Sequence, residues 1–422
     1  MEESNCERDH QAHTQADSTP DYRRVPDIRF RGFTYAWERR KLDETVSFYS
    51  GLTYSPSDIC DAGGTLVLRS SNVQSGELAF VDNVYVNDSV ASSEQVRKND
   101  LIVVVRNGSR ALLGKHAIIR DDMPKTVIGA FMTGIRSDEQ EFMNALMSSR
   151  AFESEINKNL GATINQITGG MFAEMTFSMP DESEQHAIGS LFFKLDSLVT
   201  LHQRKLTKLH TIKKALLEKM FPTPGSTIPE IRFRGFTETW ERRKFGELYR
   251  PVSEKNDLSF GRDKAISVAN MYFNPALYVT EDSYLATYNV MRLGDIAFEG
   301  NRNKRFAHGR FVENTIGDGI VSHVFKVFRH VGDNYDLSYW KHAINNEKLM
   351  KDVLTRSTKA STMMHELVTA DFLEESTLVP SLNEQRAIGA AIDSIDHLAT
   401  LYQHKLNKLH CIKKALLEKM FV

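Results

Sequence analysis

The sequence predicts an α+β protein in which two α/β domains are separated by two long antiparallel helices, related by an internal pseudo-two-fold repeat. Three observations support this fold class. Two segments occur twice, about 200 residues apart. The longer of them has the hydrophobic period of a helix. The blocks between them contain short β-branched runs that end at turn residues.

The repeat has two conserved segments per copy. Residues 28–42 (IRFRGFTYAWERRKL) return at 231–245 with 12 of 15 positions identical. Residues 184–221 return at 384–421 with 25 of 38 identical. The intervening blocks share almost no sequence. Each copy therefore consists of a constant block, a variable block and a constant helix.

In chain order, the predicted parts are a disordered tail, a first α/β domain, a first helix with its linker, a second α/β domain and a second helix. Their boundaries are 1–26, 27–183, 184–224, 225–383 and 384–422. The tail is acidic, since residues 1–21 hold six acidic side chains and one basic one. The rest of the chain is weakly basic, so any attraction to nucleic acid depends on local patches.

Each variable block is expected to contain a small mixed sheet and a closing helix. The predicted strands are 63–73, 100–108 and 115–121 in the first block, and 263–273, 294–303 and 322–330 in the second. The predicted helices are 140–156 and 338–354.

The two constant helices carry apolar residues in alternating steps of three and four, which predicts a helix-pair seam. Asp181 with Glu184, and Ser381 with Glu384, predict capping boxes at their starts. A helix of this length spans ~57 Å and needs a partner for its seam. We expect an antiparallel internal pair; packing of each helix on its own domain and homodimeric pairing are the alternatives. The seam residues are Ile188, Leu191, Leu195, Leu198, Leu209, Ile212 and Leu216, then Ile388, Ile395, Leu398, Leu409, Ile412 and Leu416.

Composition excludes several classes of protein. The chain is 41% hydrophobic and 26% charged, values typical of a globular protein, and no apolar run is long enough to span a membrane. Three scattered cysteines argue against a disulfide framework or a cysteine zinc site and favour a cytoplasmic location. Residues 108–116 resemble a phosphate-binding loop, but the glycine spacing is wrong and His116 replaces the required hydroxyl residue. We expect no metal site and no catalysis.

The doubled IRFxGFxxxWE motif, the variable blocks, and the EQxAI and IKKALLEKMF phrases that open and close each helix resemble the DNA specificity subunit of Type I restriction–modification systems. The resemblance implies a non-catalytic subunit in defence against foreign DNA. Each variable block would be a target recognition domain that reads one half of a bipartite, asymmetric site. The helices would form a coiled-coil spacer.

The resemblance also implies partners. These are double-stranded DNA, two methyltransferase (modification) subunits and endonuclease/translocase (restriction) subunits. The chain itself is expected to bind no cofactor, and S-adenosylmethionine, ATP and magnesium are expected on the partner subunits. The alternatives are a stand-alone DNA methyltransferase or nuclease, and a coiled-coil adaptor that binds proteins only.

Candidate DNA-binding residues lie in polar loops of the variable blocks, where arginine matches guanine edges and asparagine or glutamine matches adenine edges. Such loops are alternatively only solvated turns. The repeated lysines at 205, 208, 213, 214 and 219 either solvate the helices or contact DNA or a methyltransferase. The candidates are Arg69, Ser71, Asn72, Arg106, Asn107, Ser109, Arg110, Lys115, Asn165 and Gln166, then Asn301, Arg302, Asn303, Lys304, Arg305 and Arg310.

Overall fold

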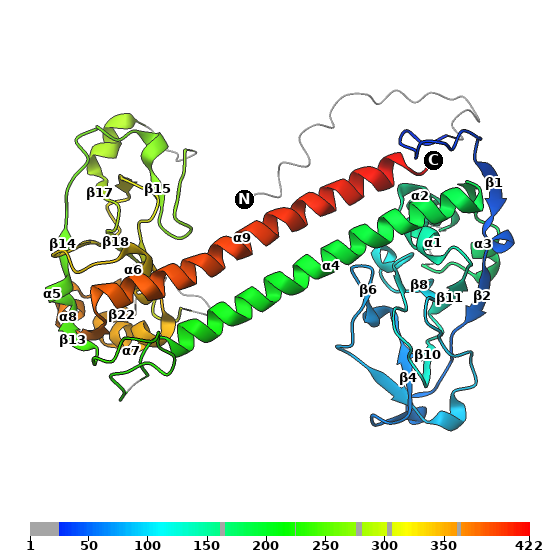
Figure 1. Cartoon of the computed structure of the whole chain (residues 1–422), viewed down its shortest axis with the longest axis horizontal. Coiled ribbons are helices and arrows are strands. Elements are labelled where there is room, and N and C mark those ends of the chain that lie inside the picture. The colour runs from blue at the N-terminus through cyan, green and yellow to red at the C-terminus, as the bar shows by residue number, and fades with distance from the viewer. Residues whose placement is uncertain (1–24, 161–164, 224, 276–280, 302–305, 361–363) are drawn as a thin grey trace. The chain divides into compact units, whose positions relative to one another are not determined.

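The computed structural model describes residues 25–160, 165–223, 225–275, 281–301, 306–360 and 364–422 (Figure 1). The mixed helix and sheet class predicted from the sequence is confirmed. Contacts divide the chain into a first unit, Met1–Gln203 with His404–Val422, and a second unit, Arg204–Gln403. Both divisions fall inside long helices, α4 (Glu182–Lys219) and α9 (Leu382–Lys419). Each unit thus holds one variable block, the beginning of one long helix and the end of the other.

The main sheet has the same strand order in both units. In the first unit it is β2-β11-β8-β9, and in the second β14-β21-β18-β19, with neighbours antiparallel throughout. The variable blocks therefore fold alike although their sequences differ. The strands are β2 (Ser47–Ser50), β8 (Leu101–Val104), β9 (His116–Ile118) and β11 (Met132–Arg136), then β14 (Tyr249–Val252), β18 (Ile296–Glu299), β19 (Arg310–Glu313) and β21 (Val327–His330).

A buried aspartate stands directly before the central strand of each main sheet. Asp100 accepts hydrogen bonds from the Arg136 guanidinium, with Nε at 2.9 Å, and Asp295 accepts the same bond from Arg329 at 2.9 Å. Tyr49 Oη also donates to Asp100, at 2.7 Å. A buried carboxylate is stable only when it is paired in this way. The shared pair shows that the two blocks use one folding solution.

Smaller sheets complete each unit. In the first unit the order is β10-β4-β7-β3, in which β4 and β10 are parallel, beside a β5–β6 hairpin. These strands are β3 (Ile59–Cys60), β4 (Thr65–Leu68), β5 (Val73–Gln74), β6 (Glu77–Leu78), β7 (Val84–Val86) and β10 (Thr126–Ile128). Two-stranded sheets of the second unit include β15 (Ile266–Ser267) with β16 (Tyr272–Phe273), β17 (Asn289–Met291) with β20 (Gly319–Val321), and β22 (Thr358–Ala360) with β23 (His365–Leu367).

The predicted helices 140–156 and 338–354 are each broken into two. Ser149 Oγ accepts a bond from the Phe152 amide, and Asn346 Oδ1 accepts one from the Lys348 amide, so each begins a new helix. The α-helices are α1 (Gln140–Met147), α2 (Arg150–Asn159) and α3 (Gly169–Ala173), then α5 (Phe245–Leu248), α6 (Leu337–Ala343), α7 (Glu347–Ser357) and α8 (Thr369–Glu374). Short 3₁₀ turns are Leu42–Glu44, Pro56–Asp58, Ser70–Asn72, Asp88–Val90, Arg110–Leu112, Arg262–Lys264 and Asp282–Thr287. In the described part of the chain, no helix has the length and apolarity to cross a membrane.

Within each unit the two long helices run antiparallel. Figure 1 shows the end of α9 beside the beginning of α4 in the first unit, where Lys413 Nζ pairs with Asp196. In the second unit Lys213 Nζ pairs with Asp396 at 2.6 Å. Lysine near the end of one helix thus meets aspartate near the start of the other. Each helix begins against its own block and ends against the other.

Nine of the thirteen predicted seam residues are buried or half-buried, and four are exposed. Ile188, Leu195, Leu209 and Leu216, with Ile388, Ile395, Leu409 and Leu416, lie buried or half-buried, and so does Leu191. Leu198, Ile212, Leu398 and Ile412 are exposed, whereas Phe192, Leu206, Ile392 and Leu406 are buried. From Ile188 the buried line advances by four and then three residues, the reverse of the predicted steps. Adjacent apolar pairs such as Leu191–Phe192 permit either line in the sequence.

Candidate nucleic-acid interface

The two constant segments meet at a buried glutamate in each unit. Glu184 accepts two bonds from the Arg29 guanidinium at 2.6 Å and one from Trp37 Nε1 at 3.1 Å. The hydrogen bond to Glu184 raises the pKa of the Arg29 guanidinium above its ordinary value. The predicted capping boxes are therefore wrong for the Glu184 side chain, although its amide does bond Asp181 at 2.9 Å.

The second unit repeats this junction. Glu384 accepts two bonds from Arg232 at 2.7 Å, and Ser381 Oγ caps the helix at 3.4 Å from the Glu384 amide. In both junctions a strand of the constant block pairs with the strand that precedes the long helix: β1 (Glu38–Lys41) pairs with β12 (Thr176–Met179), and β13 (Glu241–Lys244) pairs with β24 (Ser376–Val379). Arginine in IRFRGF and glutamate in EQxAI are thus partners, which the repeat could have suggested.

The closing phrase KMF anchors each long helix in the core of a unit. Phe421 lies 6.3 Å from Trp37 and 6.0 Å from Phe192, measured between ring centroids, in the first unit. Phe221 lies 6.2 Å from Trp240 and 5.6 Å from Tyr339 in the second unit. Because each phenylalanine packs on the tryptophan of its unit's constant block, the same closing phrase fits both anchor sites. This explains why the chain carries it twice.

The predicted basic loops occupy one position in the fold. Residues 105–115 connect β8 to β9, and residues 300–309 connect β18 to β19. Arg106, two residues after β8, forms a β-bridge with Gln166; Asn301, two residues after β18, forms one with Met364. The two reading hairpins, as we call these connections, are therefore equivalent elements of unlike sequence.

In the first unit three predicted loops converge around the reading hairpin. Asn107 Nδ2 donates to Ser70 Oγ at 3.0 Å, and Asn165 Nδ2 donates to the Gly108 carbonyl at 3.1 Å. The exposed Arg106 guanidinium lies 5.0 Å from the ring centroid of Phe131, which is itself half exposed. The structure thus joins loops that lie up to a hundred residues apart in the sequence.

A groove of about 680 Å³ lies between these loops. Its walls combine apolar and polar side chains: Tyr54, Ile59, Arg69, Asp82, Asn107 and Phe131. Ser71 is exposed at this groove, and Ser109, Arg110 and Lys115 are exposed on the reading hairpin. Side chains of this kind suit contact with base edges and phosphates.

Two candidates of the first unit hold the loop structure instead. Asn72 is fully buried, its Oδ1 accepts from the Arg69 amide at 2.9 Å, and its Nδ2 donates to the Ala79 carbonyl at 2.9 Å. Arg69 Nη2 donates to the Asp82 carboxylate at 2.6 Å. The free chain therefore does not present Asn72 to solvent, and Arg69 is committed to a neighbour.

In the second unit Arg302, Asn303, Lys304 and Arg305 lie outside the described residues. Asn301 is exposed at the start of the hairpin. Arg310, at its end, donates to Glu299 at 2.7 Å and to the Ala269 carbonyl at 2.5 Å. Its guanidinium also lies 5.1 Å from the Phe306 ring centroid, so Arg310 holds the hairpin base.

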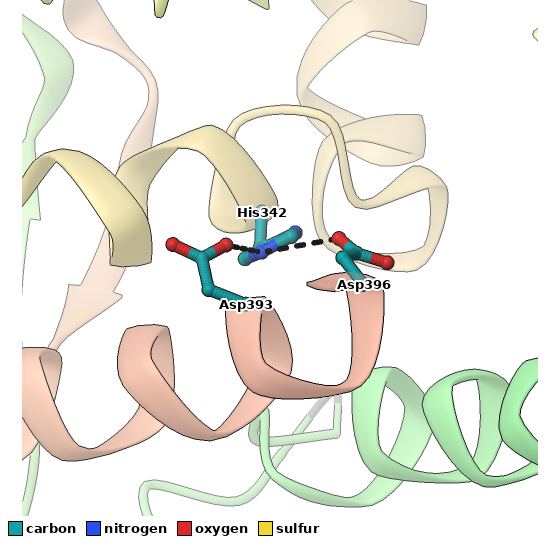
Figure 2. A group of neighbouring side chains, drawn as sticks. All are labelled: His342, Asp393 and Asp396. Carbon is teal, nitrogen blue, oxygen red and sulfur yellow. Dashed lines mark hydrogen bonds and ion pairs between the residues drawn. The ribbon is translucent and has the colours of Figure 1, made fainter. Parts of the chain in front are cut away.

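Figure 2 shows His342 of α6 facing Asp393 and Asp396 of α9. His342 Nε2 lies 2.9 Å from Asp393 Oδ1 and 3.9 Å from Asp396 Oδ2. Burial lowers the pKa of His342 more than the Asp393 bond raises it. Lys341 bonds Asp393 at 2.5 Å and Lys213 bonds Asp396 at 2.6 Å. Two ammonium groups thus already neutralise the carboxylates, and we assign the cluster to helix docking.

The repeated lysines have mixed surroundings. Lys213 and Lys413 pair across the helices, Lys219 pairs with Glu230 at 2.5 Å, and Lys205 Nζ lies 5.3 Å from the Tyr402 ring centroid. Lys208, Lys214, Lys408 and Lys414 are exposed. Lysines 213 and 413 therefore have a structural role, and the exposed ones remain candidates for contact with partners.

Comparison with known proteins adds to this geometry. Residues 35–211 match the family described as Type I restriction modification DNA specificity domain. This part of the chain is similar to the DNA specificity domains of that family. The match covers the first variable block and most of α4, so the resemblance predicted from the repeated motifs is confirmed.

Relatives extend the likeness beyond residues 35–211. The StySPI specificity subunit of Salmonella potsdam is 21% identical over 91% of this chain and 88% of its own length. The MjaVIII specificity subunit of Methanocaldococcus jannaschii is 25% identical over 43% of this chain and 44% of its own. The crystal structure of an S subunit from M. genitalium has a TM-score of 0.61 at 15% identity, covering 94% of this chain and 99% of that one. That likeness shows a shared fold.

Proposed function

We propose that the chain is the non-catalytic specificity subunit of a Type I restriction–modification complex. Each unit reads one half of a bipartite, asymmetric DNA site, and α4 and α9 fix the spacer between the halves. The observation that carries this proposal is the contrast within the repeat. The anchors and the sheet order are the same in both units, whereas the reading hairpins differ in sequence.

The contrast has a direct functional meaning. A protein that held two identical partners and read one palindrome would repeat its reading loops as faithfully as its helices. This chain keeps Phe221 and Phe421 in equivalent places but puts VRNGSRALLGK in one hairpin and GNRNKRFAHG in the other. Base contacts depend on side-chain identity, so the two half-sites differ.

The proposal includes the partner subunits. Two methyltransferase subunits dock on the constant segments, which present the same exposed residues twice, among them Leu198, Leu201 and Ile212 with their copies. Endonuclease/translocase subunits join that complex in the cytoplasm. S-adenosylmethionine, ATP and magnesium bind to these partners. The units that read DNA correspond to residues 27–183 and 225–383.

The test uses the full chain assembled with its methyltransferase subunits. Binding to a duplex carrying the methylated motif is measured at 50 and 200 mM salt, and affinity should fall steeply as phosphate contacts are screened. Arg106→Ala should weaken motif binding about 5- to 150-fold, the range for one good base contact. Arg97→Ala is the matched control, because Arg97 is exposed on another turn and pairs with Glu94 at 3.1 Å.

The result separates the three candidate functions. A reader of DNA loses affinity with salt and with Arg106→Ala but not with the control. An adaptor that binds proteins only would bind no duplex, even in the complex. A stand-alone methyltransferase would methylate DNA without its partners, which the proposal excludes.

A further inference from the structure

The turn between β6 and β7 presents two neighbouring apolar side chains to solvent. Phe80 is 52% exposed and Val81 is 85% exposed. Ile59 and Phe131, which line the nearby groove, are also about half exposed. Scattered apolar residues on a surface are ordinary, but an adjacent pair beside further exposed apolar residues indicates a contact surface.

This turn is held rigidly from beneath. Arg69 Nη2 donates to the Asp82 carbonyl at 2.9 Å and to its carboxylate at 2.6 Å. The backbone carbonyl of the buried Asn72 accepts a hydrogen bond from the Ala79 amide at 2.8 Å, and the Asn72 side-chain Nδ2 donates to the Ala79 carbonyl at 2.9 Å. Residues on both sides of the Phe80–Val81 tip are thereby fixed. A pre-organised tip loses little conformational entropy when it binds.

The tip adjoins the groove formed by the candidate DNA loops. Asp82, next to Val81, lines that groove together with Arg69, Asn107 and Phe131. Ser70, next to Arg69, receives the hydrogen bond from Asn107 of the reading hairpin. Arg69 and Asn72, the Phe80–Val81 tip and the reading hairpin therefore belong to one connected surface.

We propose that Phe80 and Val81 contact bases of the first half-site, with thymine methyl groups as the ligand chemistry, and that Arg69 and Asn72 position this tip. The inference rests on the proposed function and adds an apolar element to its polar readers. Apolar side chains distinguish thymine by its C5 methyl group in the major groove. The placement also gives Asn72, which is buried, a part in recognition without a base contact.

The occupant is DNA and not a docked subunit for a reason of symmetry. A partner present in two copies must use features that both halves of the chain repeat. Residues 79–83 belong to a variable block, and the two variable blocks share almost no sequence. The groove that Asp82 lines also contains Phe131, and the exposed Arg106 guanidinium, 5.0 Å from the Phe131 ring centroid, suits the charge of DNA.

The test again uses the full chain with its methyltransferase subunits, bound to duplexes that carry the mapped motif. Each thymine of the first half-site, on either strand, is replaced in turn by uracil, which removes only the methyl group. For the unaltered chain, one such replacement should weaken binding about 3- to 10-fold. Phe80→Ser with Val81→Ser should weaken binding to the thymine duplex by at least as much and become insensitive to that uracil. Val324→Ser, an exposed valine of the second unit, is the control and should behave as the unaltered chain does.

The positioning residues have their own readout. Arg69→Gln should reduce the uracil sensitivity in the first half-site while leaving discrimination at the second half-site unchanged, which general loss of folding would not do. Size-exclusion chromatography checks that every variant still assembles with the methyltransferase.

Two results would overturn the inference. In the first, the Phe80→Ser, Val81→Ser variant keeps full sensitivity to uracil. In the second, this variant assembles poorly with the methyltransferase, but the fraction that does assemble binds DNA as the unaltered complex does. If the unaltered complex fails to distinguish the motif from a scrambled duplex, the proposed function itself fails.

Discussion

The two units solve the same architectural problem with different side chains. Both order their main sheet alike, place an arginine–aspartate pair at the central strand, and receive a long helix through a phenylalanine anchor. They differ in the reading hairpins and at two buried positions, one beside a long helix and one on the last strand of the main sheet. The comparison teaches that sequence identity marks where the halves must meet equivalent partners, while a shared fold needs far less.

The first buried difference lies where a long helix meets a variable block. The amide of Phe142 approaches Gly189, as the amide of Tyr339 approaches Gly389, which makes these positions equivalent. Three residues further on stand Ala145 in one unit and His342 in the other. The long helix carries Phe193 in the first unit, partly exposed with its ring centroid 5.0 Å from the Arg120 guanidinium, and Asp393 in the second, where Asp393 pairs with Lys341 and His342.

The second difference lies on the last strand of the main sheet. Leu101 pairs with Ile118 in the first unit, and its counterpart Ile296 pairs with Glu313 in the second. Glu313 is buried and accepts a hydrogen bond from Tyr335 Oη at 2.5 Å. Burial raises the pKa of Glu313 well above its ordinary range. One sheet thus tolerates an ionisable group that its twin does not contain.

Removing an anchor should give the largest effect. Phe421→Ala should destabilise the first unit, and Phe221→Ala the second, each by about 3–5 kcal/mol, the usual cost of truncating a buried phenylalanine. Hydrogen exchange resolved by peptide measures both units in one experiment. Equal increases in hydrogen exchange at β8 and β18 in either variant would contradict the view that each phenylalanine stabilises its own unit.

Removing a buried glutamate should come next. Glu184→Ala leaves Arg29 and Trp37 without a partner, at a cost of about 3–5 kcal/mol. Glu384→Ala should cost less, because Glu384 lacks the tryptophan bond that Glu184 accepts, as far as the described residues show. Urea unfolding followed by tryptophan fluorescence would measure the two values. Equal losses would argue against a contribution from the Trp37 bond.

Stability of the second unit should depend on pH through Glu313. Its folded pKa lies above the unfolded value of 4.5, so its contribution is fully present below that pH and is lost as pH rises toward the folded pKa. Relative to Glu313→Gln, the natural unit should therefore lose up to about 1.4 kcal/mol per pH unit above pH 4.5. Unfolding of both proteins at pH 5 and pH 8 checks this. A constant difference between them would show that Glu313 does not titrate in this way.

The helix-crossing lysines should give the smallest effect. Lys213→Met should cost about 1 kcal/mol in the second unit and Lys413→Met a similar amount in the first, since both pairs are partly screened by solvent. Double-mutant cycles with Asp396→Asn and Asp196→Asn isolate each pair. Coupling of Lys213 to Asp196 instead of Asp396 would contradict the antiparallel arrangement.

Repetition made the long helices and the meeting of their ends predictable, but local ambiguity limited the detail. Leu191 and Phe192 both fit a seam, and only burial beside Phe421 selects Phe192. Glu184 suits a capping box by position, yet Arg29, more than 150 residues away, binds it more strongly. The sequence suggests that Asn72 is a free donor in a loop, because no local pattern shows that its side-chain amide bonds the Ala79 carbonyl. Long-range partners decided each of these cases.

The central claim is that each unit reads its own half of the DNA site. The most direct test replaces residues 43–183 with the corresponding block of another specificity subunit and maps methylated adenines across a genome that expresses the cognate methyltransferase. The account predicts that one half of the methylated motif changes while the other half and the spacer length stay as they were. Alteration of both halves, or a changed spacer, would contradict it.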